Sequence, residues 1–573
     1  MKNFFKFKIV LVLLFIFLLG CETLDLDQTA DRSTPDSRFN NPTNSFNYIQ
    51  LELKDFVDSA NDFTQRVTRQ MAMTGGDTYD NAFEKVSFNQ NWSVGYGILE
   101  AIKITEPLAI EKKNYYVQGA SKIVKAYVLM TLVDIYGDVP YTEALNPAIL
   151  EPKYDNGADV YKQAIISLDE GIAIMATAPS SKEVIDLYYA KNAARWVTLA
   201  KTLKLKMYVN CQLSGVDIGV NNINSAVAAI FAENDLIDND TEDFVFRFGA
   251  NRNTPNSRHP LYNDQYELGG GAYIANYFLW AVTVEKGKPS DFDPRAGFYF
   301  YKQRSINSGI SIIDVPGRTR PQHYNETNYN SFFDPNIRSC YTVSNWTGQN
   351  SITTGGYLGR DHGNNAGTPP DANIRSVVGV YPVGGAFGNL TTSAASSVQR
   401  SGVDGAVGAG IIPIFMSSYV QFLKAEAILK LGVSGDAKLV MKNAISKSID
   451  RVVQPVNGYP VLSVSNLATI ASKKLAYLDF VDATYESLLS SDKRLELITK
   501  EYYIALWGNG IEAYNNYRRT GFPSNMQPTL EFNSGPFYFS ALYPANVSSN
   551  NPNAPKEGRT RRVFWDKFNF NLK

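Results

Sequence analysis

The sequence predicts a mainly α fold, in which stacked helical pairs form an α-solenoid scaffold around a large inserted region of loops and short strands. Three observations predict it. Apolar residues recur at spacings of three and four through several segments near both ends of the chain. Each of these segments would expose an apolar face that a neighbouring helix must bury. Between 244 and 410 this periodicity gives way to Asn-, Gly-, Ser- and Pro-rich sequence with scattered aromatic rings.

The N-terminus has the pattern of a bacterial lipoprotein signal. Three lysines precede an uninterrupted apolar run over 9–19, which is too short to span a membrane, since a helix needs about 20 apolar residues for that. Gly20 and Cys21 follow at once, and this order resembles the lipobox, whose cysteine thiol is acylated. We therefore expect a signal peptide over 1–20 and lipidation of Cys21. An ordinary secretion signal that ends in cysteine is the alternative.

Residues 21–43 are expected to form a flexible tether behind the acylated cysteine. The stretch is rich in Thr, Asp, Pro and Asn and contains few apolar residues, so it cannot bury a core. No later segment approaches the length of a transmembrane run, so lipid alone would hold the protein to its membrane.

The rest of the chain, 44–573, is expected to form one domain. Its helical scaffold covers 44–243 and 411–523, and a C-terminal loop segment covers 524–573. Helical periodicity is clearest over the segments 115–136, 160–175, 190–213, 413–431, 436–453 and 492–507. Because the strict consensus of a helical repeat is absent, the periodicity alone predicts stacked helical pairs and no specific repeat type.

The inserted region 244–410 begins with a predicted strand, since apolar residues alternate over 244–248. A loop region of this length inside one domain is usually functional. Its rings could pin the loops onto the helices, or some of them could form a surface platform for a ligand. They are Tyr262, Tyr266, Tyr273, Tyr277, Trp280, Tyr324, Tyr329, Trp346, Tyr357 and Tyr381.

Composition narrows the function. The 55 Lys and Arg nearly cancel the 56 Asp and Glu, and no basic run occurs, which argues against nucleic-acid binding. Three His and three Cys in 573 residues argue against a metal centre built from them. Cys211 and Cys340 are expected to be separate buried thiols, with a disulfide as the alternative. Aromatic residues make up 13% of the chain, which suits recognition of neutral polar ligands.

Catalytic signatures are missing, so we expect neither an enzyme nor a cofactor. The chain contains no G-x-S-x-G elbow, no H-E-x-x-H and no P-loop. Asp238, Asp240 and Glu242 alternate as in a calcium loop, but the sixth and twelfth positions of that loop are not met, which favours a solvated turn. For Glu426 and for the adjacent Arg518 and Arg519, buried or half-buried structural pairing is an explanation at least as good as catalysis.

Several segments together resemble the SusD/RagB family of Bacteroidota outer-membrane lipoproteins, in particular its SusD-like branch. The most telling is the run DIYGDVPYTEAL at 134–145. The others are the lipobox with LDLD at 24–27, WSVGY at 92–96, WV at 196–197 with LKLKM at 203–207, DPR at 293–295, KAEA at 424–427, EAY at 512–514 with RRTGFP at 518–523, and RRVFW at 561–565. The last segment lacks the Tyr-Pro and the following Glu that are usual in the family.

The resemblance implies tetratricopeptide-like helix pairs, display at the cell surface and anchoring in the outer membrane by lipid. It also implies work as the lid of a SusC-like TonB-dependent barrel, with capture of an oligosaccharide or a peptide for import. Two other functions stay open at this point. One is an accessory or structural subunit of such a complex, for example in outer-membrane protein assembly, and the other is a surface hydrolase with two facing carboxylates.

Ligand contacts implied by the resemblance fall on two stretches. The loop between the first two helices holds Asp77, Tyr79, Asn81 and Phe83, and the loop-rich region holds Tyr324, Trp346 and Tyr357. The sequence does not decide between glycan and peptide, nor the stoichiometry with the barrel.

Overall fold

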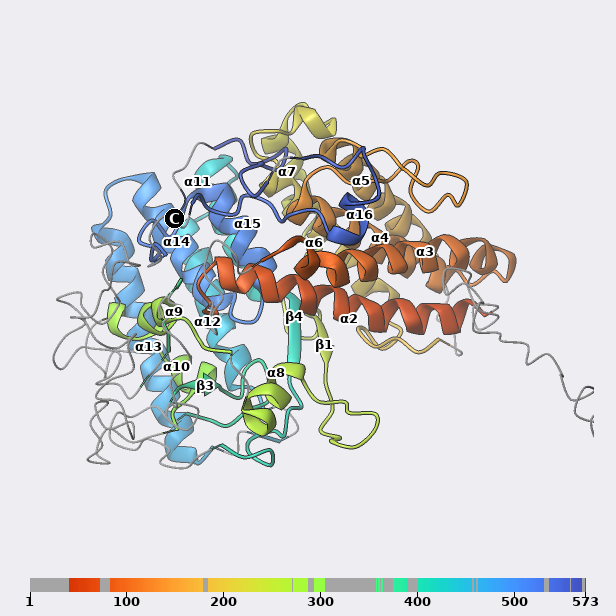
Figure 1. Cartoon of the computed structure of the whole chain (residues 1–573). Coiled ribbons are helices and arrows are strands. Elements are labelled where there is room, and N and C mark those ends of the chain that lie inside the picture. The colour runs from red at the N-terminus through yellow and green to blue at the C-terminus, as the bar shows by residue number, and fades with distance from the viewer. Residues whose placement is uncertain are drawn as a thin grey trace, which may run out of the picture.

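The computed structural model describes residues 41–72, 83–178, 184–269, 272–286, 293–303, 357, 359–360, 362–363, 375–388, 400–455, 458–459, 462–529, 535–556, 558–568 and 572. Cys21, the tether up to residue 40, and the predicted ligand residues Asp77, Tyr79, Asn81, Tyr324 and Trp346 lie outside these ranges, as does Cys340. Figure 1 shows a helical scaffold with the loop-rich region on one side of it.

The N-terminal half of the scaffold is a run of helices in which each packs on the next. These are α2 (Pro42–Val67), α3 (Asn89–Glu111), α4 (Tyr115–Tyr136), α5 (Gly157–Met175), α6 (Ala193–Asn210) and α7 (Ile223–Glu233), with the short turns η3 (Lys85–Phe88) and η4 (Val216–Ile218) between them. The C-terminal half consists of α11 (Ser417–Lys430), α12 (Ala437–Val453), α13 (Val464–Ser487), α14 (Ser491–Ala505) and α15 (Gly510–Thr520). Here α11 packs on α12 and α14, and α15 packs back on α2. The prediction of a mainly α fold of stacked helical pairs is confirmed.

Most scaffold helices begin at a side chain that accepts a hydrogen bond from the first turn. An oxygen in this position satisfies one of the four backbone N–H groups that a helix start leaves without partners. Asparagine does this at six helices, namely at Asn41, Asn114, Asn156, Asn192, Asn222 and Asn509. Since Asn41 caps α2 and Pro42 opens it, the helix includes the last two residues of the expected tether.

The loop-rich region leaves and rejoins the scaffold through one pair of strands. β1 (Phe244–Arg247) pairs antiparallel with β4 (Ile411–Phe415), so that Arg247 lies opposite Ile411. Between them lie α8 (Pro260–Tyr262), the π-helical turn η5 (Asn263–Leu268), α9 (Asn276–Val282), η6 (Val284–Lys286), α10 (Ala296–Tyr299) and the short pair β2 (Phe300–Tyr301) and β3 (Val377–Val378). The strand expected over 244–248 is confirmed. A helix over 413–431 is wrong at its start, because the buried run 411–415 extends as β4 and α11 begins only at Ser417.

Aromatic rings of the loop-rich region are mostly core residues. Those of Tyr262, Tyr266, Tyr273, Tyr277, Tyr357 and Tyr381 are each at most 5% exposed. Tyr262 and Tyr266 stack with ring centroids 4.6 Å apart, and the Tyr266 hydroxyl donates to the backbone oxygen of Val378 at 2.7 Å. For these six rings, the interpretation that rings pin the loops is therefore the correct one.

The C-terminal segment beyond α15 runs back over the scaffold, and its one short helix among the described residues is α16 (Ala545–Ser548). Its Trp565 is buried against α4 and donates to Asp134 at 2.9 Å. Cys211, at the end of α6, is a free buried thiol whose pKa is raised by burial. Within the part of the chain that the structure describes, no helix has both the length and the apolar character needed to cross a membrane.

Candidate functional site

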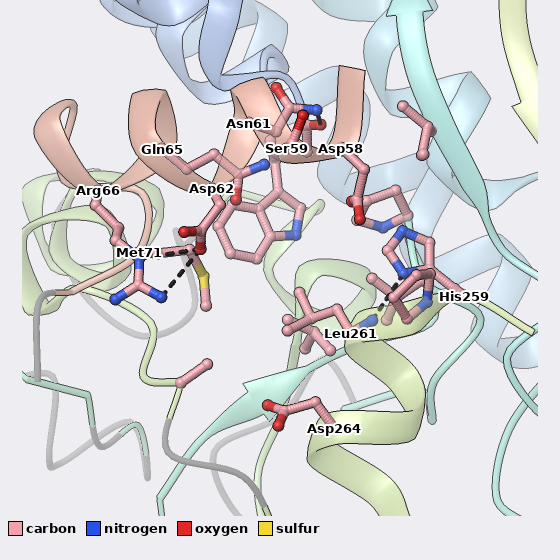
Figure 2. A pocket seen from close by; sticks show the side chains of 18 of the residues that line it. Asp58, Ser59, Asn61, Asp62, Gln65, Arg66, Met71, His259, Leu261 and Asp264 are labelled. Atoms are coloured by element: carbon pink, nitrogen blue, oxygen red, sulfur yellow. Dashed lines mark hydrogen bonds and ion pairs between the residues drawn. The ribbon is translucent and has the colours of Figure 1, made fainter. Parts of the chain in front are cut away.

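A cleft of about 710 Å³ lies between α2 and the loop-rich region (Figure 2). Volumes of roughly 300–1,000 Å³ are usual for small-molecule sites. One wall is a face of α2 that carries Asp55, Asp58, Asp62 and Gln65. The opposite wall comes from α8 and η5, with His259, Leu261 and Asp264, and the remainder includes Pro382, Ile412 and Trp507.

Helical spacing places the polar residues of α2 on a single face. The three aspartates follow one another at intervals of three and four, so their side chains project in the same direction. The opposite face of the helix carries Phe56, Ala60 and Phe63, which are buried in the core. Asn61 fixes the helix to the connection between α14 and α15, because its amide donates to the backbone oxygen of Gly508 at 3.2 Å and its carbonyl accepts from the N–H of Gly510 at 2.9 Å.

Two carboxylates in the cleft have no protein partner. Asp58, from α2, and Asp264, from η5, lie on opposite walls, and neither accepts a hydrogen bond or forms an ion pair within the described part of the chain. Burial raises the pKa of Asp58 to about 6, and burial also raises the pKa of Asp264. Both groups therefore lose hydration in the fold without gaining a hydrogen bond or an ion pair from a described residue, and only the more distant positive charges of Lys54, for Asp58, and of Arg375, Arg400 and Arg66, for Asp264, act on them.

The other charged groups of the cleft are already paired or neutral. Arg66 donates to Asp62 from Nε at 3.1 Å and from Nη2 at 3.0 Å, and Asp55 pairs with Lys54. His259 accepts a hydrogen bond at Nδ1 from the N–H of Leu261 at 3.2 Å. Burial lowers the pKa of His259 to about 3, so its ring is neutral at physiological pH. Among the described lining residues, the cleft is therefore acidic.

Trp507 adds a donor to the cleft. The residue lines the cavity and is 2% exposed, and its indole Nε1 has no hydrogen-bond partner among the described atoms. A buried N–H without a partner costs about 1–3 kcal/mol, so such groups are rare in folded proteins unless water or a ligand satisfies them. The amide of Gln65 also makes no hydrogen bond with any described residue. Carboxylate, amide and indole groups are thus available together for a polar ligand.

Two of the ligand residues expected from the sequence can be located. Phe83 is 7% exposed and lines a small cavity of about 30 Å³, which shares Ser59, Asp62 and Ser87 with the cleft. Tyr357 is 3% exposed and packs edge-on against Phe300, with the Lys302 ammonium 5.1 Å from its ring centroid. Both positions stay predictions as ligand contacts. Ala72 and Ser87 line the cleft from either side of the segment that holds the other residues of the first stretch.

Sequence reasoning missed the residues of the cleft. Asp58, Asp264 and Trp507 come from three distant segments, so no local motif joins them. One signal was present in the sequence: the aspartates 55, 58 and 62 with the amides 61 and 65 mark a polar face on α2 that is more acidic than a solvent-exposed helix requires.

Other residues considered for chemistry have structural roles. Glu426 and Arg519 form a buried bidentate pair, with both N–O distances at 2.8 Å. In the turn at 238–243, two carboxylates accept hydrogen bonds from protein groups. Glu242 accepts from the N–H of Asp238, and Asp240 accepts from the side-chain amide of Gln454. Within the described residues, no three His, Cys, Asp or Glu side chains gather as metal ligands would.

Comparison with family models decides the classification of the chain. Residues 30–314 match a SusD-like model described as starch-binding and associating with the outer membrane. Residues 408–542 match a second model, described as the SusD and RagB outer membrane lipoproteins. The chain belongs to the SusD/RagB family. This is a family of outer-membrane lipoproteins, and the descriptions of both models name binding or the membrane and no catalytic activity.

Solved structures have the same fold over most of the chain. A chitin-binding protein matches with a TM-score of 0.63 and 20% identity, over 92% of this chain and 100% of its own. A SusD/RagB family protein from Bacteroides thetaiotaomicron has a TM-score of 0.63 and 17% identity, over 92% and 98%. A chitin-binding SusD homologue from Flavobacterium johnsoniae has a TM-score of 0.60 and 17% identity, over 92% and 98%. The fold is the SusD-like fold of tetratricopeptide-like helical pairs. A comparison with curated proteins finds no match.

Proposed function

We propose that this SusD-like protein is a surface-exposed nutrient-binding lipoprotein that captures an oligosaccharide in the cleft between α2 and the loop-rich region. It is held to the outer membrane by lipid on Cys21 and acts as the lid of a SusC-like TonB-dependent importer. The observation that carries the proposal is the set of unpaired polar groups in the cleft, namely Asp58, Gln65, Asp264 and the indole N–H of Trp507.

Sugar hydroxyls fit this set of groups because each can both donate and accept. A carboxylate accepts from one hydroxyl, an amide bonds a second, and the indole N–H donates to a third. Each of these groups would regain in the complex the hydrogen bonds that it lost on folding. These hydrogen bonds would stabilise the complex with the glycan. The cleft also offers apolar contact from Leu261, Val383 and Ile412 for the C–H faces of the rings.

The comparisons support a glycan over a peptide. One family model is described as starch-binding, and two similar structures are chitin-binding proteins. The other contacts expected from the sequence belong to this proposal as well, and they lie outside the described residues: Asp77, Tyr79, Asn81, Tyr324 and Trp346.

A lid needs no catalytic group. It needs a ligand site, a partner surface and two positions whose equilibrium the ligand can shift. An oligosaccharide that contacts both α2 and the loop-rich region would favour the closed position only if it also contacts the barrel. Opening and closing of the lid therefore depend on binding alone and need no pair of catalytic carboxylates.

Isothermal titration of the full chain against oligosaccharides of starch, cellulose and chitin tests glycan capture. The chain is purified in a polyoxyethylene detergent, which carries no sugar. At least one series should bind with a Kd in the micromolar range, near −8 kcal/mol, and Trp507→Phe should weaken it. A mixture of peptides that binds while every oligosaccharide fails at millimolar concentration would contradict the proposal.

The anchor and the partner are tested separately. Cys21→Ser should move the protein from the outer-membrane fraction to the soluble fraction, whereas the unmodified chain should co-purify with a β-barrel after chemical cross-linking. A chain that stays in the membrane without Cys21, or that cross-links to no barrel, contradicts these parts of the proposal and leaves glycan capture unaffected.

A further inference from the structure

We infer that the cleft selects oligosaccharides that carry protonated amines, such as oligomers of glucosamine, over neutral sugars of the same length and linkage. This inference rests on the proposed function and adds the charge of the ligand to it. It depends on three observations: the charge of the described lining, two of its carboxylates that form no hydrogen bond or ion pair with a described residue, and a buried donor that lines the same cavity.

The described lining of the cleft carries more negative than positive charge. Asp55, Asp58, Asp62 and Asp264 line it, while Arg66 is the one cation among its described lining residues and is bound to Asp62. Lys54 is held by Asp55, and its ammonium lies 6.0 Å from the ring centroid of Phe246, outside the cleft lining. A cationic ligand would therefore enter a site of negative potential, and an anionic one would be repelled.

Asp58 and Asp264 are the groups that would bind the amine. They come from opposite walls, so a ligand between them is within the field of both. Neither carboxylate forms an ion pair with a described cation, although the charge of Lys54 acts on Asp58 and the charges of Arg375, Arg400 and Arg66 act on Asp264. A hydroxyl would give such a carboxylate one hydrogen bond from a neutral donor. An ammonium donor carries a positive charge, so it adds the attraction of opposite charges and offsets the cost of burying the carboxylate.

Trp507 indicates that the rest of the ligand is a polar molecule and not a bare cation. Its Nε1–H is buried, lines the same cavity and has no described acceptor, and a metal ion could not satisfy a donor. A sugar ring supplies the missing acceptor through a hydroxyl or ring oxygen. A sugar residue with an amine and a hydroxyl therefore supplies a cationic donor for the carboxylates and an acceptor for the indole N–H.

Three hexasaccharides with the same β-1,4 backbone test the inference, since they differ only at C2. Hexaglucosamine carries amines, chitohexaose carries neutral acetamides, and cellohexaose carries hydroxyls. Calorimetry of the full chain at pH 6.5 and 50 mM salt should give a Kd at least tenfold lower for hexaglucosamine than for the two neutral sugars. Raising the salt to 500 mM should remove most of that preference, because screening weakens charge attraction.

The double variant Asp58→Asn, Asp264→Asn keeps the shape of the cleft and removes its unpaired charges. It should lose the preference for hexaglucosamine while its affinity for chitohexaose changes by less than threefold. Asp169→Asn is the matched control, since Asp169 is 52% exposed on α5 and pairs with Lys204. The salt series on the unmodified chain keeps the test valid if the double variant does not fold.

The outcomes separate the two proposals. Equal affinity for the three hexasaccharides, or tighter binding of the neutral ones, overturns charge selection and leaves glycan capture standing. No binding of any hexasaccharide overturns both. A preference for hexaglucosamine that survives the double variant also overturns the inference, since the amine is then bound elsewhere.

Discussion

The carboxylate of Asp134, in α4, accepts a hydrogen bond from the indole of Trp565 at 2.9 Å, across 431 positions of sequence. The same carboxylate accepts from Lys206 at 3.1 Å, from Asn515 at 2.7 Å and from the hydroxyl of Tyr161. Asp134 is fully buried, so these four donors replace its water shell. The aspartate that opens the DIYGDVPYTEAL segment thus joins four parts of the scaffold, which explains its place in the segment without any role in binding.

Replacing Trp565 by phenylalanine should destabilise the fold. The change removes one donor from a buried carboxylate, and a hydrogen bond to a charged group contributes about 1.5–3 kcal/mol. Urea unfolding followed by circular dichroism measures the loss. Trp507→Phe is the control, because that indole N–H has no described partner and its removal should cost less. Equal losses in the two variants would contradict this role of Asp134.

Glu426→Gln should be among the most damaging single changes in the scaffold. The residue forms both of its short contacts with Arg519, and each partner is 2% exposed. Removing one member of a buried pair leaves the other charge uncompensated and costs roughly 3–5 kcal/mol. Glu486→Gln breaks an exposed pair with Lys438 and should leave the unfolding midpoint unchanged. A stable Glu426→Gln protein would show that Arg519 is satisfied by Asn210 and Asn516 alone.

Asp58→Asn should stabilise the protein at pH 7.5 and have little effect at pH 4. Because burial raises the pKa of Asp58 to about 6, the folded state holds the proton more tightly than the unfolded state does. The wild-type carboxyl therefore supports folding below about pH 4 and loses that contribution as the pH rises through 6. The variant should gain about 2–3 kcal/mol at pH 7.5. Denaturant midpoints at both pH values check this, and lower stability of the variant at pH 7.5 would refute it.

Gly171→Ala should destabilise the contact between α4 and α5. A Cβ at this position would lie 2.7 Å from Cγ1 of Ile123 and 3.2 Å from the backbone oxygen of Gly119. Overpacking of this kind costs about 1–3 kcal/mol, which exceeds the gain in helix propensity. Gly97→Ala in α3 is the opposite case, since its nearest neighbour is Oη of Tyr48 at 3.7 Å. It should stabilise by about 0.5–1 kcal/mol, and thermal melts of the two variants should move in opposite directions.

The sequence predicted those helices that are bounded by clear signals and buried on a wide face. The helix expected over 115–136 has those bounds in the structure, because Asn114 caps it and Gly137 ends it with a positive φ of 82°. α13 escaped prediction because few of its side chains are buried and several apolar ones, such as Val464 and Leu475, face solvent. A peripheral helix of this kind has no apolar stripe that matches its buried face.

The residues of the candidate site were harder to predict from the sequence than the fold was. The aromatic content of the sequence indicates ligand recognition, but six of the loop tyrosines are core residues. The cleft is formed by α2, η5 and the end of α14, and only folding brings Asp58, Asp264 and Trp507 together. Pairwise contacts across more than 200 positions cannot be inferred from one sequence without related sequences.

The pairing of Arg247 with Ile411 has an evolutionary consequence. The chain leaves the helices and returns to them at neighbouring strands, about 4.8 Å apart. Insertions and deletions between these two points change the closure entropy little, since doubling the length of a loop costs only about 0.6 kcal/mol. The loop-rich region can therefore change in length and sequence between these two strands while the helices of the scaffold stay as they are.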